Sequence, residues 1–471
     1  MSDFPLTIAD AAKALRSGDI TSVQLTETLI ERANRLDSTI GCFIHRTNET
    51  ALEAAARADK QLRAGVDLGP LQGIPLGIKD IISTDEAPTT AQSLVLNPAW
   101  GAEGDGPLMK RLRAAGAVIT GKTTTMEFAI GLPDELKPFP IPRNPWDLSR
   151  WPGGSSSGTG NGIAAGLFLG GLGTDTGGSV RMPACFCGVS GMKQTFGLVP
   201  KSGCVPLGYS LDHIGPLARS VRDCAIMLNV MAGYDASDPT SVKMSVPDYT
   251  ATLDGTAKGM RVGVDRENHL GRDGFEPEAA AAFESALDAL KAAGAEIVEL
   301  TIPHYSDLVT VDTITIAGEA GAYHMPDLQS RWSDYGRFTS QFLALAAFFS
   351  GADFVQAQRF RSYIRPVLLD LMADLDAIVM PTCGVEAPEL ATFSSLDFFK
   401  LPIFTQQWNP TGFPAMSIPM GLGPAGTPYG LQLVAKPFDE AAAFRLGDAF
   451  QQLTSFHLQV PEIAKTAATA A

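Results

Sequence analysis

The chain has 471 residues, 45% of them hydrophobic, and its 51 acidic side chains outnumber its 36 basic ones to give a formal charge of −15. This length suits about three core-sized units, although large α/β enzymes often fold as one body. The acidic balance argues against nucleic-acid binding, because affinity for the phosphate backbone is built from clustered Lys and Arg.

Cysteine and histidine positions indicate neither a disulfide framework nor a metal site. The six cysteines lack paired CxxC spacing, and the six histidines include no HExxH motif and no ligand-like spacing. The N-terminus has no cationic segment followed by an apolar one, and no run of about 18 uncharged apolar residues occurs. We therefore expect a cytoplasmic enzyme with no metal, no cofactor and no membrane or nucleic-acid partner, working as a monomer or homodimer.

Taken in chain order, the predicted elements begin with helices over the first 65 residues, where Thr7 and Thr21-Ser22 each precede a period of 3.6. The apolar run GIPLGIKDII (73–82) predicts a buried strand that carries one lysine, Lys79. Asp105 is expected to cap a helix through Leu112, followed by a strand in AVITGKTT. Further helices are expected at 219–232, 275–294, 331–349, 354–374 and 438–456, and strands near 260–264, 295–301, 377–380, 415–419 and 429–434. This alternation indicates an α/β fold.

Two nucleotide-binding patterns occur in the wrong context. Residues 116–123 spell the phosphate-loop pattern GxxxxGK[ST], but a helix precedes the first glycine and apolar strand residues fill the cradle. Residues 160–165 fit the loose dinucleotide form GxGxxA without the buried strand that must precede it. Neither motif is expected to bind a nucleotide.

Residues 153–179 are rich in glycine and serine around an apolar stretch that looks helical. A flexible linker is the simplest alternative, but linkers do not contain core-like runs such as Leu167-Phe168-Leu169. Glycines packed around buried serines allow backbone N–H groups to converge on one point, as an oxyanion hole requires. Acyl transfer on a serine is therefore the leading hypothesis.

A serine nucleophile needs a base, and two candidates are available. His213 is the nearest histidine, although a loop or packing role suits it better. Lys79 lies in an apolar strand, where burial would disfavour its charged form and supply a neutral amine near neutral pH. The ordinary alternative for Lys79 is a strand-end lysine whose ammonium reaches solvent.

Three groups of residues together resemble the amidase signature enzymes: GIPLGIKD (73–80), GGSSSG (153–158) leading into GTDTGGSVRMPACFCGVSGMK (173–193), and NPTGFPAMSIPMG (409–421) followed by GLQLV (430–434). The resemblance covers nearly the whole chain and is weakest over 235–375. It implies an α/β amidase signature fold with a large mixed, mostly parallel β-sheet core covered by helices on both faces. The implied organisation is a single amidase domain, 1–471, made of N-terminal helices (1–65), a signature core (70–235), a variable substrate-shaping region (236–375), the C-terminal part of the core (376–457) and a tail (458–471).

The resemblance also assigns roles to residues. Ser179 would be the nucleophile, Ser155 the bridging serine preceded by a cis peptide bond, and Lys79 the base. The backbone N–H groups of Thr176, Gly177, Gly178 and Ser179 would form the oxyanion hole. Asp175 and Arg181 flank the nucleophile loop and are candidates for an ion pair that holds it, while Ser156 or Thr174 are candidates for hydrogen bonds within it.

The substrate is less well defined than the chemistry. Gln194 stands where the family usually has proline, and residues 131–138 differ from the polar segment typical of glutamine-hydrolysing A subunits of tRNA-dependent amidotransferases. A free-standing amidase acting on a small-molecule amide is therefore favoured over such a subunit, which is the alternative, and over an inactive scaffold. The family also includes enzymes that cleave anilides, carbamates (urethanes), ureas and esters, so the sequence leaves these open.

Residues 331–360 hold an excess of aromatic side chains: Trp332, Tyr335, Phe338, Phe342, Phe348, Phe349, Phe354 and Phe360. Four residues, Phe338, Phe342, Leu345 and Phe349, recur at helical spacing, which is typical of an ordinary core stripe. Phe348 lies off that stripe. If part of this surface lines the substrate pocket, aryl or long-chain amides and aryl carbamates should be preferred over acetamide or glutamine.

Overall fold

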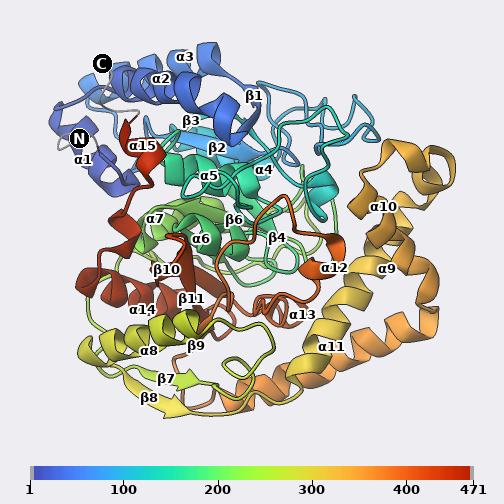
Figure 1. Ribbon diagram of the computed structural model, residues 1–471. Coiled ribbons are helices and arrows are strands. Elements are labelled where there is room, and N and C mark those ends of the chain that lie inside the picture. The colour runs from blue at the N-terminus through green and yellow to red at the C-terminus, as the bar shows by residue number, and fades with distance from the viewer. Residues whose placement is uncertain (1–4, 467–471) are drawn as a thin grey trace.

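The computed structural model describes residues 5–466, which contain eleven strands. The strands are β1 (Phe43–Arg46), β2 (Pro75–Lys79), β3 (Val118–Thr123), β4 (Gly170–Asp175), β5 (Ser190–Lys193), β6 (His213–Ala218), β7 (Arg261–Val264), β8 (Glu296–Glu299), β9 (Ala377–Pro381), β10 (Ala415–Leu422) and β11 (Pro428–Ala435). They form one sheet through the middle of the molecule, in the order β1-β3-β2-β4-β6-β5-β10-β11-β9-β7-β8 (Figure 1).

The sheet is mixed, as expected, but the balance within it differs from the prediction. Six neighbouring strand pairs are antiparallel and four are parallel. The prediction that the sheet is mostly parallel is therefore wrong. One reason is the short connection between β10 and β11, which can join only antiparallel neighbours. The parallel pairs lie toward the two ends of the strand order. The group β3-β2-β4 at one end contains Lys79, on β2.

The helices described are α1 (Ile8–Ser17), α2 (Ser22–Ile40), α3 (Asn48–Arg63), α4 (Pro107–Ala114), α5 (Ser157–Ala165), α6 (Arg181–Cys187), α7 (Val221–Met231), α8 (Pro277–Ala292), α9 (Tyr305–Arg331), α10 (Arg337–Ala344), α11 (Gly351–Leu371), α12 (Ser395–Phe398), α13 (Trp408–Thr411), α14 (Glu440–Leu453) and α15 (Glu462–Thr466). Short 3₁₀ turns are η1 (Glu127–Ala129), η2 (Trp332–Asp334), η3 (Leu345–Phe348) and η4 (Phe456–Leu458). The predicted tail from 458 therefore contains α15, and residues 467–471 lie outside the described part of the chain.

Helices cover both faces of the sheet. Neighbouring residues of a strand point to opposite faces, and a Cβ at Gly170 of β4 would touch Ile8 of α1 and Met227 of α7. A Cβ at the next residue, Gly171, would instead touch Thr159 of α5. The predicted arrangement of helices on both faces is thus confirmed.

Some predicted elements need correction. Strand β1 interrupts the N-terminal helices, and β4, β5 and β6 were not expected. Asp105 does not cap α4, because Gly106 occupies the N-cap position and the Asp105 carboxylate pairs with Arg113. The helix predicted over 331–349 is broken into η2, α10 and η3, since Tyr335 and Gly336 have extended backbones.

Helices α9, α10 and α11 form a lobe at one side of the body (Figure 1). Over residues 5–466 we find no single helix of the length and apolarity needed to cross a membrane. The stretches Arg337–Phe348 and Gly351–Leu371 meet that requirement only when taken together, and they are bent by 94° at their junction.

Candidate active site

Lys79 lies at the end of β2 and is completely buried. Strand β4 runs parallel to β2, so its final residues reach the same edge of the sheet. There Lys79 Nζ donates hydrogen bonds to Ser155 Oγ and to Thr174 Oγ1, both at 2.7 Å. Burial lowers the pKa of this amine from 10.5 to about 7. The alternative of a solvent-reaching lysine is therefore wrong.

Ser155 lies just before α5, and the peptide bond between Gly154 and Ser155 is cis. Its side chain is nearly buried, and its hydroxyl is the group that Lys79 contacts. The next residue, Ser156, joins this segment to the nucleophile loop, since its backbone N–H donates to the Ser179 carbonyl at 3.2 Å. The Ser156 hydroxyl also exchanges hydrogen bonds with the backbone of Thr174, at 3.1 and 3.2 Å.

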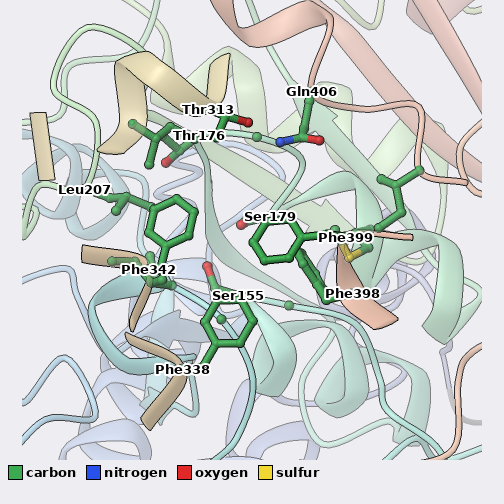
Figure 2. A pocket seen from close by; sticks show the side chains of 18 of the residues that line it. Ser155, Thr176, Ser179, Leu207, Thr313, Phe338, Phe342, Phe398, Phe399 and Gln406 are labelled. Atoms are coloured by element: carbon green, nitrogen blue, oxygen red, sulfur yellow. The ribbon is translucent and has the colours of Figure 1, made fainter. Parts of the chain in front are cut away.

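Ser179 lies in the loop between β4 and α6 and is partly exposed. Within residues 5–466 its hydroxyl has no hydrogen-bond partner, whereas Ser155 is already engaged by Lys79. Both serines line the same cavity, and Figure 2 shows their hydroxyls reaching into it from two separate segments. The structure thus brings together Lys79, Ser155 and Ser179, which are separated by 76 and 24 residues in the sequence.

Asp175 and Arg181 hold the nucleophile loop through a fully buried ion pair, with Arg181 Nη2 and Asp175 Oδ1 2.7 Å apart. Asp175 also accepts hydrogen bonds from the backbone N–H groups of Gly178 at 2.9 Å and Val180 at 3.2 Å. Burial alone would raise the pKa of this carboxyl, but the Arg181 guanidinium holds it well below its ordinary value. The predicted ion pair is present, and it fixes both ends of the loop.

The N–H group of Gly178 is committed to Asp175, so the predicted oxyanion hole loses one of its four donors. Gly178 has a positive φ of 135°, and a Cβ there would collide with the hydroxyl of Thr405. That hydroxyl donates to the Gly177 carbonyl at 2.7 Å. Glycine at 178 therefore serves the shape of the loop, and the N–H groups of Thr176, Gly177 and Ser179 remain as candidate donors.

His213 does not contact either serine. It is buried on β6, and its Nδ1 lies 3.2 Å from the backbone carbonyl of Asp175. Burial lowers its pKa well below the ordinary value, so the ring is neutral. The packing role expected for His213 agrees with this position.

A cavity of about 160 Å³ opens beside the two serines. For comparison, an apolar cavity of roughly 150 Å³ in another protein accepts benzene. Its lining is mostly apolar, and the part of the chain described here contributes no charged side chain to it. The polar side chains in the lining are Ser155, Thr176, Ser179, Thr313 and Gln406.

Phenylalanines form one wall of this cavity (Figure 2). Phe338 and Phe342 come from α10, and Phe398 and Phe399 come from α12 and the residue after it. The Phe338 ring stacks on Phe399 at 6.1 Å and meets Phe398 edge-on at 5.8 Å. Two members of the predicted stripe therefore face the cavity, whereas Phe348 is 80% exposed and does not line it.

Several residues at the site were not anticipated. Phe398, Phe399 and Gln406 line the cavity, and Thr405 and Asn409 hold the nucleophile loop. Asn409 belongs to the matched stretch NPTGFPAMSIPMG, so the family pattern marks it without giving its partner. Nothing in the sequence singles out the two phenylalanines.

Residues 116–123, which match the phosphate-loop pattern, have a structural role. Their lysine, Lys122, is buried in β3, pairs with Asp80 at 3.1 Å and donates to Thr89 at 2.8 Å. No group of three or more His, Cys, Asp or Glu side chains within residues 5–466 is arranged to hold a metal ion.

A family model described as Amidase matches residues 24–444. The chain belongs to the amidase signature family. It is an amide-hydrolysing enzyme of that family, and the expected fold class is confirmed.

This amidase is 39% identical to the A subunit of the glutamyl-tRNA(Gln) amidotransferase of Chloroflexus aurantiacus, with 97% of this chain and 98% of that protein covered. Among solved structures it resembles the same kind of subunit from Thermotoga maritima, with a TM-score of 0.83, 31% identity and coverage of 98% and 99%. It also resembles the peptide amidase of Stenotrophomonas maltophilia, with a TM-score of 0.82, 30% identity and coverage of 95% and 96%.

Proposed function

We propose that this amidase hydrolyses neutral, apolar amides, including aryl amides and aryl carbamates, through an acyl-enzyme on Ser179. The observation that carries the proposal is the cavity beside Ser179, which holds a benzene-sized space and has no charged side chain in its described lining. Apolar surface that enters it contributes roughly 25 cal/mol for each Å² removed from water.

The proposed reaction uses one contact already described, the hydrogen bond between Lys79 Nζ and Ser155 Oγ, and a proton transfer between two serine hydroxyls that line the same cavity. Ser179 Oγ attacks the substrate carbonyl while its proton passes to Ser155 Oγ. The Ser155 proton passes to Lys79 Nζ over the 2.7 Å between the two atoms, with the neutral amine accepting from the Ser155 hydroxyl. The developing oxyanion accepts hydrogen bonds from free N–H groups of the loop Thr176–Ser179. Protonated Lys79 then returns its proton through Ser155 to the leaving nitrogen as the C–N bond breaks.

Water completes the cycle by the same route. Its proton passes through Ser155 to Lys79, its oxygen bonds to the acyl carbon, and the acid product leaves as the proton returns to Ser179. Thr174 supports this sequence because it is the second hydrogen-bond partner of Lys79 Nζ and so helps to aim the amine at Ser155.

The second candidate is a glutamine-hydrolysing amidotransferase subunit. Identity of 39% along nearly the whole chain to the A subunit of a glutamyl-tRNA(Gln) amidotransferase supports it, and on sequence similarity alone it is the better supported function. In that case partner subunits and tRNA would replace the expectation of no nucleic-acid partner. Against it stands the cavity lining, because free glutamine carries an ammonium and a carboxylate, and buried charges need partners.

A substrate panel separates these functions. The purified chain is given glutamine, a simple anilide and an aryl carbamate, and release of ammonia or aryl amine is followed, with the Ser179→Ala protein as the matched control. We expect kcat/KM to be highest for the aryl substrates. Equal or greater efficiency on glutamine would overturn the apolar-substrate proposal and favour the amidotransferase function. Cytoplasmic location and a monomeric or homodimeric state remain predictions.

A further inference from the structure

Helix α10 carries Phe338 and Phe342 into the cavity, yet its own first turn lacks the usual capping groups. Its N-cap is Gly336, which has no side chain to accept a hydrogen bond, and no acidic residue occurs in the first turn. The first N–H groups of a helix have no partner within the helix and need an acceptor from elsewhere. The acceptors at α10 come from a segment two hundred residues away in the sequence.

Two carboxylates of the segment 127–134 supply these acceptors. Glu127 Oε2 accepts from the Gly336 N–H at 2.6 Å, and Asp134 Oδ2 accepts from the Arg337 N–H at 2.8 Å. Negative charge beside a helix N-terminus is favourable, because the unpaired N–H groups carry partial positive charge there. The start of α10 is thus fixed from outside the helix.

Glu127 is itself well anchored. It is only 8% exposed, and its other oxygen, Oε1, accepts from the Ser93 hydroxyl at 2.6 Å. The residues that follow it, 129–131, line the cavity, and Gly131 packs directly against the Phe338 ring. One carboxylate therefore joins two parts of the same cavity wall, namely residues 129–131 and α10.

We propose that Glu127 is a positioning residue for substrate selection, which holds α10 so that Phe338 packs against aryl substrates in the cavity. This inference rests on the proposed function, since it assigns the aryl preference to a wall that Glu127 keeps in place. Glu127 does not line the cavity and takes no part in proton transfer; it acts through Gly336 and α10.

The test compares Glu127→Gln with Glu386→Gln as the matched control. Glu386 is also 8% exposed and also accepts backbone hydrogen bonds, from Ala425 and Thr427 at 3.0 Å, but it serves the β10–β11 connection, and none of these three residues lines the cavity. Both variants lose a comparable set of charge-assisted hydrogen bonds, so a purely structural role would give them similar kinetics.

For Glu127→Gln we expect kcat/KM on an anilide to fall roughly tenfold, mainly through a higher KM, the size expected for one charge-assisted hydrogen bond. The value for acetamide should change by less than about twofold, and Glu386→Gln should leave both substrates unaffected. When Phe338 is already replaced by alanine, adding Glu127→Gln should lower kcat/KM for the anilide by less than about twofold, because the ring that Glu127 positions is absent.

Unchanged anilide KM in Glu127→Gln, or full additivity with Phe338→Ala, would overturn the inference. If Glu127→Gln does not fold, Ser93→Ala removes one anchor of the same carboxylate and should show the same KM effect in a smaller amount. If the wild type shows no preference for the anilide over acetamide or glutamine, the proposed function itself fails. If the wild type prefers the anilide but Glu127→Gln has an unchanged KM for it, only the role of Glu127 is refuted and the proposed function stands.

Discussion

Replacing Lys79 by methionine should stabilise the protein while abolishing its activity. The amine is completely buried, and its pKa falls from 10.5 in water to about 7 in the folded chain. At pH 7 this fall corresponds to about 4 kcal/mol of unfolding free energy lost by burying the amine. Its two hydrogen bonds, to Ser155 and Thr174, offset about 1–3 kcal/mol of that loss. Lys79→Met should therefore raise the free energy of unfolding by about 1–3 kcal/mol at pH 7.

The sign of the pH dependence makes this test specific. Between pH 7 and pH 10.5 the unfolded chain holds a proton on Lys79 and the folded chain does not, so wild-type stability rises with pH relative to the variant. The unfolding free energy lost by burying Lys79 is largest below pH 7 and decreases towards zero as the pH approaches 10.5. From pH 7 to pH 9 the advantage of Lys79→Met should shrink by about 2 kcal/mol.

The measurement is urea unfolding of both proteins at several pH values, with Lys60→Met as a control because Lys60 is exposed. Other ionisable groups titrate in both proteins and cancel in the difference. A difference in unfolding free energy that stays constant from pH 7 to pH 9 would mean that Lys79 is charged in the folded chain. The account of Lys79 as a neutral base would then be refuted.

Three further predictions concern the site. Ser179→Ala should abolish hydrolysis of an anilide, and Ser155→Ala should lower kcat by several orders of magnitude without unfolding, as circular dichroism can check; near-normal turnover in either would contradict the assignment. For the wild type, kcat/KM should rise about tenfold from pH 6 to pH 8 as Lys79 loses its proton, whereas a fall over this range would exclude a neutral lysine base. Asp175→Asn leaves Arg181 buried without its counter-charge and should cost about 3–5 kcal/mol in urea unfolding; unchanged stability would show that the pair does not hold the loop.

Among the strands that the sequence did not predict, β4 is the one built largely from glycine. Strand β4 is GGLGTD, and glycine gives little strand signal because it has no side chain to pack. Its glycines are required by neighbours that the sequence does not reveal. A Cβ at Gly171 would meet the backbone carbonyl of Gly77 at 2.6 Å.

Helix α9 was missed for a related reason. Gly318, Gly321 and Pro326 lie within its 27 residues and weaken the helical pattern. Contacts with residues distant in the sequence compensate for this weak helical propensity. A Cβ at Gly321 would collide with Ala346, and one at Gly318 would approach the Phe354 ring at 2.8 Å, so both glycines lie close to neighbouring segments.

The candidate site was predictable where residue chemistry is unusual and unpredictable where only spatial proximity matters. A lysine inside an apolar strand and serines among glycines are unusual enough to be noticed in the sequence, whereas the choice of Ser155 and Ser179 among those serines rests on the family resemblance. The structure brings Lys79, Ser155 and Ser179 together. That Phe398 and Phe399 would meet Phe338 depends on how segments sixty residues apart are folded. The commitment of the Gly178 N–H to Asp175 likewise depends on loop geometry.

The most direct test of the central claim is to trap the acyl-enzyme. The protein is mixed with an activated aryl ester, quenched in acid within the first turnover, digested and analysed by mass spectrometry. We predict that the acyl group is found on the peptide that contains Ser179 and is absent from the Ser179→Ala protein. An acyl group on Ser155 or on another residue, or product formed in a burst with no covalent adduct, would contradict the account.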